Sequence, residues 1–133
     1  MTIGAHLDVE AFFRRWAISF DEMCDAYRTA LGEGGEWVAG PPPIPTTYGG
    51  EAAVGLLEGF RDGYDLTTID VDLLSFGGSG GVVYSERVDH LVDSTGSRFL
   101  SLPVAGVMRF DGGYLSHWRD YWDMRDFLAL PRR

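Results

Sequence analysis

The sequence has no lysine, no asparagine and no glutamine, and all eleven of its basic residues are arginine. Without lysine, the chain cannot form a Schiff base with a carbonyl substrate. Cys24 is the sole cysteine, so it has no partner for an internal disulfide, which indicates a reducing, cytoplasmic compartment. Arginine in place of lysine, with abundant alanine and glycine, is typical of a bacterial source with GC-rich DNA.

Long apolar runs and basic clusters are also missing. No apolar run approaches the ~18 residues of a membrane span, and the first ten residues lack the basic and apolar regions of a signal peptide. The formal net charge of -9 and the scattered arginines argue against nucleic acid or an anionic membrane as a partner, because binding phosphate requires a basic patch. We therefore expect a small neutral or cationic molecule as the ligand.

The 133 residues, 45% of them hydrophobic, suffice for a single domain over residues 1–133 that needs neither a disulfide nor a metal. Apolar residues at helical spacing between residues 8 and 31 predict two helices. A capping box formed by Ser19 and Glu22 predicts the start of the second helix, and Gly32 predicts its end.

The next segments combine a strand, a loop and a helix. Residues 36–40 form a short predicted strand, and the prolines of residues 41–45 exclude regular backbone hydrogen bonding. Residues 51–61 follow as a third amphipathic helix.

Hydrophobic residues then alternate with a period of two, and short turns join the successive runs. Helices followed by a long antiparallel meander predict an α+β fold, with the helices against one face of a curved sheet. The predicted strands are Leu66 to Phe76, Val82 to Val92, Arg98 to Phe110 and Tyr114 to Trp122.

Three charged residues in these strands are candidates for catalysis. Arg87 and Asp89 are two residues apart, so their side chains share one face of the sheet. Asp120 lies between Trp118 and Trp122, on the face that we also assign to Tyr114 and Ser116. A carboxylate between apolar rings loses hydration, which raises its pKa unless a cation such as Arg87 compensates. Two carboxyl groups around one guanidinium allow one to act as an acid and the other as a base, which suits the opening of a strained ring.

A simpler interpretation treats Arg87 and Asp89 as an exposed ion pair that contributes ~0 to 1 kcal/mol. Spacing alone favours it, because Arg-x-Asp is an unspecific pattern and nothing in the sequence places Asp120 opposite Asp89. The histidines, including His90 and His117, are not at metal-ligand spacing. We expect no metal or other cofactor and interpret His6, His90 and His117 as structural or interface residues.

The segments ERVDHL (residues 86–91) and HWRDYWDMRDF (residues 117–127), with the hairpin PVAGVMRFDGGYLS between them, resemble the limonene-1,2-epoxide hydrolase family. Upstream, PPPIPTTYGGEAAV resembles the family's proline-rich loop and the helix that follows it. This family belongs to the superfamily that shares the cone-shaped fold of nuclear transport factor 2, ketosteroid isomerase and SnoaL-type polyketide cyclases. The resemblance implies that fold, and a homodimer formed through the sheet face opposite the pocket.

The resemblance also implies roles for the three charged residues. Asp89 corresponds to the family's general acid, Arg87 to its bridging arginine and Asp120 to the base that activates water. In the family's reaction the activated water attacks an epoxide carbon, and the acid protonates the departing oxygen without a metal or covalent intermediate. We therefore expect a hydrophobic epoxide as substrate. The residues that we expect to contact it are Trp37, Tyr48, Trp118 and Trp122.

One part of the family's pattern is missing. The family holds its water with a tyrosine and an asparagine two residues apart, whereas residues 36–40 read EWVAG here, with Trp37 in place of the tyrosine. The available substitutes are a histidine, the backbone, or the hydroxyls of Thr46, Thr47 and Tyr48.

Three interpretations follow from this departure. The chain is a hydrolase with other ligands for its water, a cyclase that activates a hydroxyl of the substrate, or a non-catalytic ligand-binding module. Trp37 favours the epoxide-opening cyclase, because a large apolar group fills space that water would occupy. A polyketide cyclase of secondary metabolism is a further alternative. A proton shuttle like that of ketosteroid isomerase would not call for an arginine between two acids.

Overall fold

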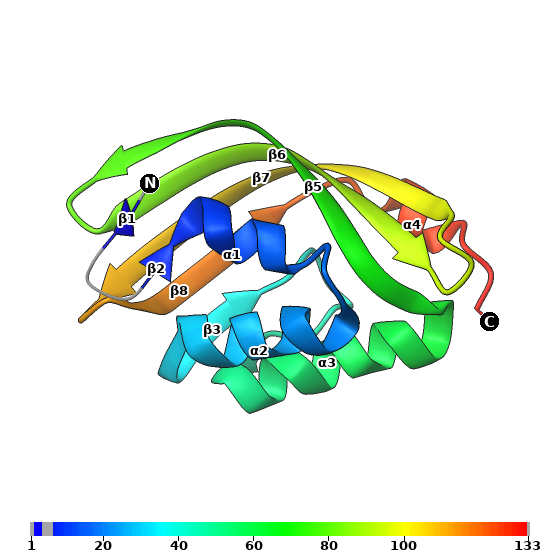
Figure 1. Ribbon diagram of the computed structural model, residues 1–133, viewed down its shortest axis with the longest axis horizontal. Coiled ribbons are helices and arrows are strands. Elements are labelled where there is room, and N and C mark those ends of the chain that lie inside the picture. The colour runs from blue at the N-terminus through cyan, green and yellow to red at the C-terminus, as the bar shows by residue number, and fades with distance from the viewer. Residues whose placement is uncertain (1, 4–6, 133) are drawn as a thin grey trace.

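The computed structural model describes residues 2–3 and 7–132, so His6 lies outside the described residues. Figure 1 shows the helices on one side of a curved sheet that arches over them. This arrangement confirms the predicted α+β fold. Two short strands, β1 (Thr2–Ile3) and β2 (Leu7–Asp8), form a separate two-stranded sheet. The helices are α1 (Val9–Arg15), α2 (Phe20–Ala30), α3 (Gly50–Tyr64) and α4 (Arg125–Leu128).

The two N-terminal helices begin at side-chain caps. The carboxylate of Asp8 accepts a hydrogen bond from the backbone N–H of Ala11 at 3.2 Å, and Ser19 Oγ accepts one from the N–H of Glu22 at 3.0 Å. α2 ends at Ala30 with Leu31 as its cap, close to the predicted end at Gly32, but the glycine does not end it in a left-handed conformation. The residue after α2, Leu31, already has extended backbone angles of -78° and 125° and starts a strand, so the chain needs no left-handed glycine there.

The main sheet has six strands in the order β4-β3-β8-β7-β6-β5. β3 runs parallel to β8, and every other neighbouring pair is antiparallel. β3 begins five residues before the predicted strand, and α4 was not predicted, because its four residues are too short for a helical period to be visible. The strands are β3 (Leu31–Val38), β4 (Thr47–Tyr48), β5 (Leu66–Ser79), β6 (Val82–Asp93), β7 (Arg98–Asp111) and β8 (Tyr114–Tyr121).

β8 contains a bulge that changes which residues face the core. Arg109 pairs with His117 but its neighbour Phe110 pairs with Leu115, so Ser116 is an extra residue on β8. Leu115 is fully buried, whereas Tyr114 is 42% exposed. The prediction that Tyr114 and Ser116 share a face with Trp118 is therefore wrong, although the alternation from His117 onward agrees with the prediction.

Between the sheet and the helices lies a core of stacked aromatic rings. Trp16, the residue after α1, stacks on Tyr27 of α2 with ring centroids 5.4 Å apart, and Trp37 of β3 stacks on Trp118 of β8 at 5.2 Å. All four residues are at most 4% exposed. This core supports the concave face of the sheet, where the charged residues of β6 and β8 lie. No helix within the described part of the chain is long and apolar enough to cross a membrane.

Candidate active site

Arg87 joins Asp89 and Asp120 in one buried cluster. Its Nε and Nη2 donate hydrogen bonds to the two carboxylate oxygens of Asp89 at 2.8 and 3.2 Å. Its Nη1 and Nη2 donate to the two oxygens of Asp120 at 3.1 and 2.8 Å. The planar guanidinium thus binds both carboxylates in a two-pronged manner, which the ammonium of a lysine cannot do. The structure brings together the three residues that the sequence singles out.

This contact crosses an intervening strand. Asp120 on β8 is paired with Gly106 on β7, which is paired with Ser85 on β6. Because neighbouring strands are about 4.8 Å apart, β6 and β8 are about 10 Å apart. A Cβ at position 106 would lie 2.8 Å from Arg87 Nη1 and 2.9 Å from Asp120 Oδ1. The missing side chain at Gly106 therefore leaves the path along which Arg87 reaches Asp120.

Water is largely excluded from the charged cluster. Arg87 is 1% exposed, Asp89 7% and Asp120 6%. The rings of Phe13 and Trp16 lie against the guanidinium, with centroids 4.9 and 5.7 Å from its central carbon, so cation–π attraction adds to the ion pairs. With both carboxylates ionised, the cluster carries one net negative charge in a site of low polarity, which favours the uptake of one proton.

The electrostatic environment shifts the pKa of two members of the cluster. Burial lowers the pKa of Arg87, but the attraction of Asp120 and Asp89 outweighs it, so the net shift is upward and the guanidinium stays charged. Burial raises the pKa of Asp89, and the positive charge of Arg87 offsets this only in part. Asp120 receives a further hydrogen bond, 2.9 Å long, from the indole Nε1 of Trp118. Asp89 is thus the carboxyl that burial pushes toward its protonated form.

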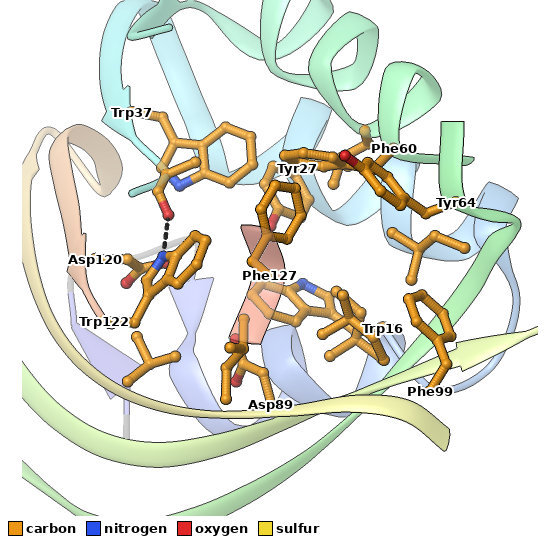
Figure 2. A pocket seen from close by; sticks show the side chains of 17 residues that line it. Trp16, Tyr27, Trp37, Phe60, Tyr64, Asp89, Phe99, Asp120, Trp122 and Phe127 are labelled. Carbon is orange, nitrogen blue, oxygen red and sulfur yellow. Dashed lines mark hydrogen bonds between the residues drawn. The ribbon is translucent and has the colours of Figure 1, made fainter. Parts of the chain in front are cut away.

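Both carboxylates line a cavity between the sheet and the helices (Figure 2). Its empty volume, together with solvent at the mouth, is about 680 Å³. Figure 2 shows Asp120 and Trp37 on one side of the cavity, and Tyr64 and Phe99 on the other. The wall is mainly aromatic, formed by Trp16, Tyr27, Trp37, Phe60, Tyr64, Phe99, Trp122 and Phe127. The cavity therefore presents acid and base groups at one end of an apolar space.

Two of the four residues expected to contact a substrate line this cavity, and two do not. Trp37 and Trp122 belong to its wall. Tyr48 lies on the edge strand β4, is 62% exposed and points away from the wall, and Trp118 is fully buried behind Asp120. Trp118 supports the carboxylate instead of contacting the cavity, so its predicted role in substrate contact is corrected, as is that of Tyr48.

The positions at which the resemblance places a water-holding tyrosine and asparagine belong to the wall as Trp37 and Ala39. The indole nitrogen of Trp37 is buried and has no hydrogen-bond partner among the described residues. The backbone carbonyl of Ala39 already accepts a hydrogen bond from Trp122 Nε1 at 2.7 Å (Figure 2). Ala39 has no polar side-chain group, and Trp37 offers an indole N–H that can donate a hydrogen bond but cannot accept one.

Several residues of the wall were not identified from the sequence as site residues. Tyr27 and Trp16 have the helical spacing of core residues, which hides any second role. Phe127 comes from α4 and reaches Tyr64 and Trp122, with ring centroids 5.1 and 5.7 Å away. The sequence signal for Phe127 was its position in HWRDYWDMRDF, a segment that resembles the limonene-1,2-epoxide hydrolase family.

The histidines of the sheet lie on its other face. His90 makes hydrogen-bonding contacts with Ser101 at 2.7 Å and Asp72 at 2.8 Å, which bridge three neighbouring strands. His117 is exposed on β8. Their placement away from the carboxylates agrees with the period-two alternation of the sequence.

Comparison with known proteins gives a family match and structural neighbours. The limonene-1,2-epoxide hydrolase catalytic domain matches residues 6–133. An epoxide hydrolase of M. tuberculosis, similar to limonene-1,2-epoxide hydrolase, has 27% sequence identity and a TM-score of 0.65, over 90% of this chain and 83% of that chain.

Two further structures show the fold. A protein of Catenulispora acidiphila with a ketosteroid isomerase-like fold, solved with trimethylamine, is 20% identical with a TM-score of 0.72, over 91% of this chain and 88% of the other. A SnoaL-like protein of Agrobacterium tumefaciens is 14% identical with a TM-score of 0.61, over 86% of this chain and 92% of the other. The cone-shaped fold that the sequence resemblance implies is confirmed.

Proposed function

The chain belongs to the limonene-1,2-epoxide hydrolase family, and we propose that it opens the epoxide ring of a hydrophobic small molecule. The observation that carries this proposal is the buried Arg87, whose guanidinium bridges Asp89 and Asp120 at the wall of an aromatic cavity. Such a cluster supplies an acid and a base within reach of one bound molecule.

In the proposed reaction Asp120 acts as the base. Its carboxylate takes a proton from the O–H of the nucleophile, whose oxygen forms a bond to one epoxide carbon while the bond from that carbon to the ring oxygen breaks. Asp89 donates its proton to the ring oxygen, which leaves as a hydroxyl. At the end Asp120 carries a proton and Asp89 is ionised, and transfer of one proton from Asp120 to Asp89 restores the starting state.

Two features of the cluster support this division of roles. The pKa of Asp89 is raised by burial, which favours the protonated form that an acid needs at the start of the reaction. Trp118 and Arg87 donate hydrogen bonds to Asp120, which hold its carboxylate in place at the cavity wall, and the family resemblance assigns this residue as the base. Arg87 keeps its charge throughout and holds both carboxylates in place.

The cavity supports a hydrophobic substrate. Its wall consists of aromatic and aliphatic side chains apart from the two carboxylates and a few hydroxyl and indole groups. A cavity of this composition binds apolar molecules by removing their surface from water, at roughly 25 cal/mol per Å². The carboxylates at one end would then select the part of the molecule that carries the epoxide.

A second candidate function differs in the nucleophile. Trp37 and Ala39 occupy the positions at which the family is expected to hold water, and in place of a hydroxyl and an amide they offer a single indole N–H. We therefore keep an epoxide-opening cyclase as the alternative, in which Asp120 deprotonates a hydroxyl of the substrate itself. The same acid and base would then yield a cyclic ether instead of a diol.

A non-catalytic binding module is the alternative of another class. It predicts that Asp89 and Asp120 are too distant or too exposed to share Arg87. The distances of 2.8 to 3.2 Å and the burial of all three residues favour catalysis, since a buried charged cluster beside an apolar ligand site brings no evident advantage to binding alone.

We also propose a homodimer formed through the outer face of the sheet. Tyr84 and Tyr121 are each 56% exposed there, and exposed aromatic rings are frequent in protein interfaces. The other residues of the proposed interface are Val88, His90 and His117. Light scattering on the purified chain tests this proposal, and a mass of one chain across the micromolar range would contradict it.

The test of function is incubation with hydrophobic epoxides, with and without an internal hydroxyl, in water enriched in heavy oxygen. Mass spectrometry then identifies the products. Label in a diol establishes water as the nucleophile, whereas an unlabelled cyclic ether establishes the cyclase. Asp120→Asn is the negative control for any turnover that is observed. No turnover of any epoxide by the wild-type chain would contradict both the hydrolase and the cyclase and leave the binding module.

A further inference from the structure

Tyr27 places a phenol in the wall of the cavity beside the carboxylates. It lies on α2, is 1% exposed, and is held by rings on three sides. Its ring stacks on Trp16 with centroids 5.4 Å apart, meets Trp37 edge-on at 4.8 Å and lies 5.3 Å from Trp118. These contacts fix the ring, so the position of the hydroxyl is fixed as well.

The hydroxyl of Tyr27 makes no hydrogen bond to any of the residues that the structure describes. Tyr27 is not among the residues with a fully buried, unpaired polar atom, so its hydroxyl is open to the cavity, where a bound molecule can form a hydrogen bond with it. The hydroxyl belongs to a residue of the cavity wall, so a molecule inside the cavity is the remaining source of a partner.

Trp118 links Tyr27 to Asp120. Its ring centroid is 5.3 Å from that of Tyr27, its Nε1 donates a 2.9 Å hydrogen bond to Asp120, and both Tyr27 and Asp120 line the cavity. Burial raises the pKa of Tyr27 well above its ordinary value, the charge of Asp120 raises it further, and the charge of Asp89 does so more weakly. Tyr27 therefore stays protonated at physiological pH. A neutral phenol can donate and accept hydrogen bonds, but it does not compete with Asp120 as the base.

Other hydroxyls are excluded by their positions. Thr46, Thr47 and Tyr48 lie outside the cavity wall. Within the wall, hydroxyl groups belong to Tyr27 and Tyr64, and Figure 2 shows Tyr64 on the side opposite Asp120. Tyr64 packs instead against Phe127 and Arg132.

We infer that the Tyr27 hydroxyl holds the nucleophilic oxygen next to Asp120, in place of the tyrosine and asparagine that Trp37 and Ala39 replace. This inference rests on the proposed epoxide opening. With water as the nucleophile, one O–H donates to Asp120 and the other to the oxygen of Tyr27, which leaves a lone pair for the epoxide carbon. With a substrate hydroxyl, Tyr27 donates to one lone pair and Asp120 accepts the single proton.

The test compares Tyr27→Phe with Tyr48→Phe, which removes an exposed hydroxyl outside the cavity wall. We expect Tyr27→Phe to lower kcat about tenfold, the effect of losing one hydrogen bond, while KM changes less than twofold. Its melting temperature should stay equal to the wild-type value, because the hydroxyl makes no hydrogen bond to a described residue and its loss leaves no partner unpaired. Tyr48→Phe should leave kcat unchanged.

The outcomes separate this inference from the proposed function. If Tyr27→Phe keeps the wild-type kcat while Asp120→Asn is inactive, the role of Tyr27 is overturned and the proposed function stands. A fall in melting temperature together with kcat would assign the hydroxyl a structural role and also overturn it. If the wild-type chain opens no epoxide, a high-resolution crystal structure tests whether the Tyr27 hydroxyl binds an oxygen next to Asp120. An ordered water within hydrogen-bonding distance of both Tyr27 and Asp120, lost in Tyr27→Phe, supports the inference, and its absence from the wild type overturns it.

Discussion

The guanidinium of Arg87 on β6 reaches the carboxylate of Asp120 on β8 across a whole strand, with Nη2 2.8 Å from Oδ2. The two residues are 33 positions apart in the chain. Their contact combines an acid, a base and a bridging cation in one cluster that lines an apolar cavity. Substitutions in and around this cluster should therefore change both the stability of the chain and its turnover of epoxides.

Gly106→Ala should break the contact. The new Cβ would lie within 3.0 Å of Arg87, Asp120 and Ser85, so these side chains would have to move. We expect a loss of about 1–3 kcal/mol in the free energy of unfolding and a fall of at least about tenfold in kcat, measured by urea denaturation and epoxide turnover.

The matched control is Gly55→Ala on the exposed side of α3, where a Cβ would meet no atom within 4 Å. It should increase stability by roughly 0.5–1 kcal/mol through helix propensity. Full activity in Gly106→Ala would show that Asp120 and Arg87 need not touch.

Asp89→Asn and Asp120→Asn should each lower kcat by about 10²–10⁴, the usual contribution of a general acid or base. The fold should persist, because an amide has nearly the same shape as a carboxyl, and circular dichroism checks this. Asp62→Asn is the control, since its side chain is 71% exposed on α3 and it pairs only with Arg61 among the described residues. Turnover near the wild-type rate in either cluster variant would contradict the paired-acid mechanism.

The raised pKa of Asp89 should appear in the pH dependence of stability. The folded chain binds the Asp89 proton more tightly than the unfolded chain, whose carboxyl titrates near its ordinary value of 3.8. The free energy of unfolding should therefore fall as pH rises from about this value to the raised pKa, because the folded state holds more protons in that window. Asp89→Asn should lack this fall. Urea denaturation at a series of pH values tests it, and parallel curves for the two proteins would contradict the shift.

Trp37→Tyr combined with Ala39→Asn should restore the water-holding pair that the family resemblance predicts at these positions. If the wild-type chain forms cyclic ethers, we expect the double variant to shift products toward the labelled diol, because the two polar groups hold water beside Asp120. The single variants serve as controls and should shift the ratio less. An unchanged product ratio in a folded double variant would show that the nucleophile is chosen elsewhere in the cavity.

Local patterns in the sequence sufficed for the elements around the site. Ser19 identified the start of α2, and the period-two alternation placed Arg87 and Asp89 on the buried face of β6. Both signals work because a helix cap and a pleated strand depend on residues only a few positions apart. The bulge at Ser116 was invisible, since it depends on how β8 pairs with β7.

The residues of the cavity wall show the limit of such patterns. Tyr48 was expected at the site as a hydroxyl that could replace the family's water-holding residues, but its strand lies at the edge of the sheet. Tyr27 was hidden because helical spacing marks every inward residue of α2 alike. The packing of the helices against the sheet decides which of their inward residues line the cavity. No local spacing of residues in the sequence predicts that packing.

The sequence by itself determined the α+β class, the family resemblance and the identity of the three charged residues. Only the tertiary structure decided that Asp89 and Asp120 share Arg87, because the contact crosses the intervening strand β7 and depends on the missing side chain at Gly106. It also decided that Tyr27, and not Tyr48, brings a hydroxyl to the cavity. Long-range pairing sets these relationships, and burial then sets the protonation of the groups that meet.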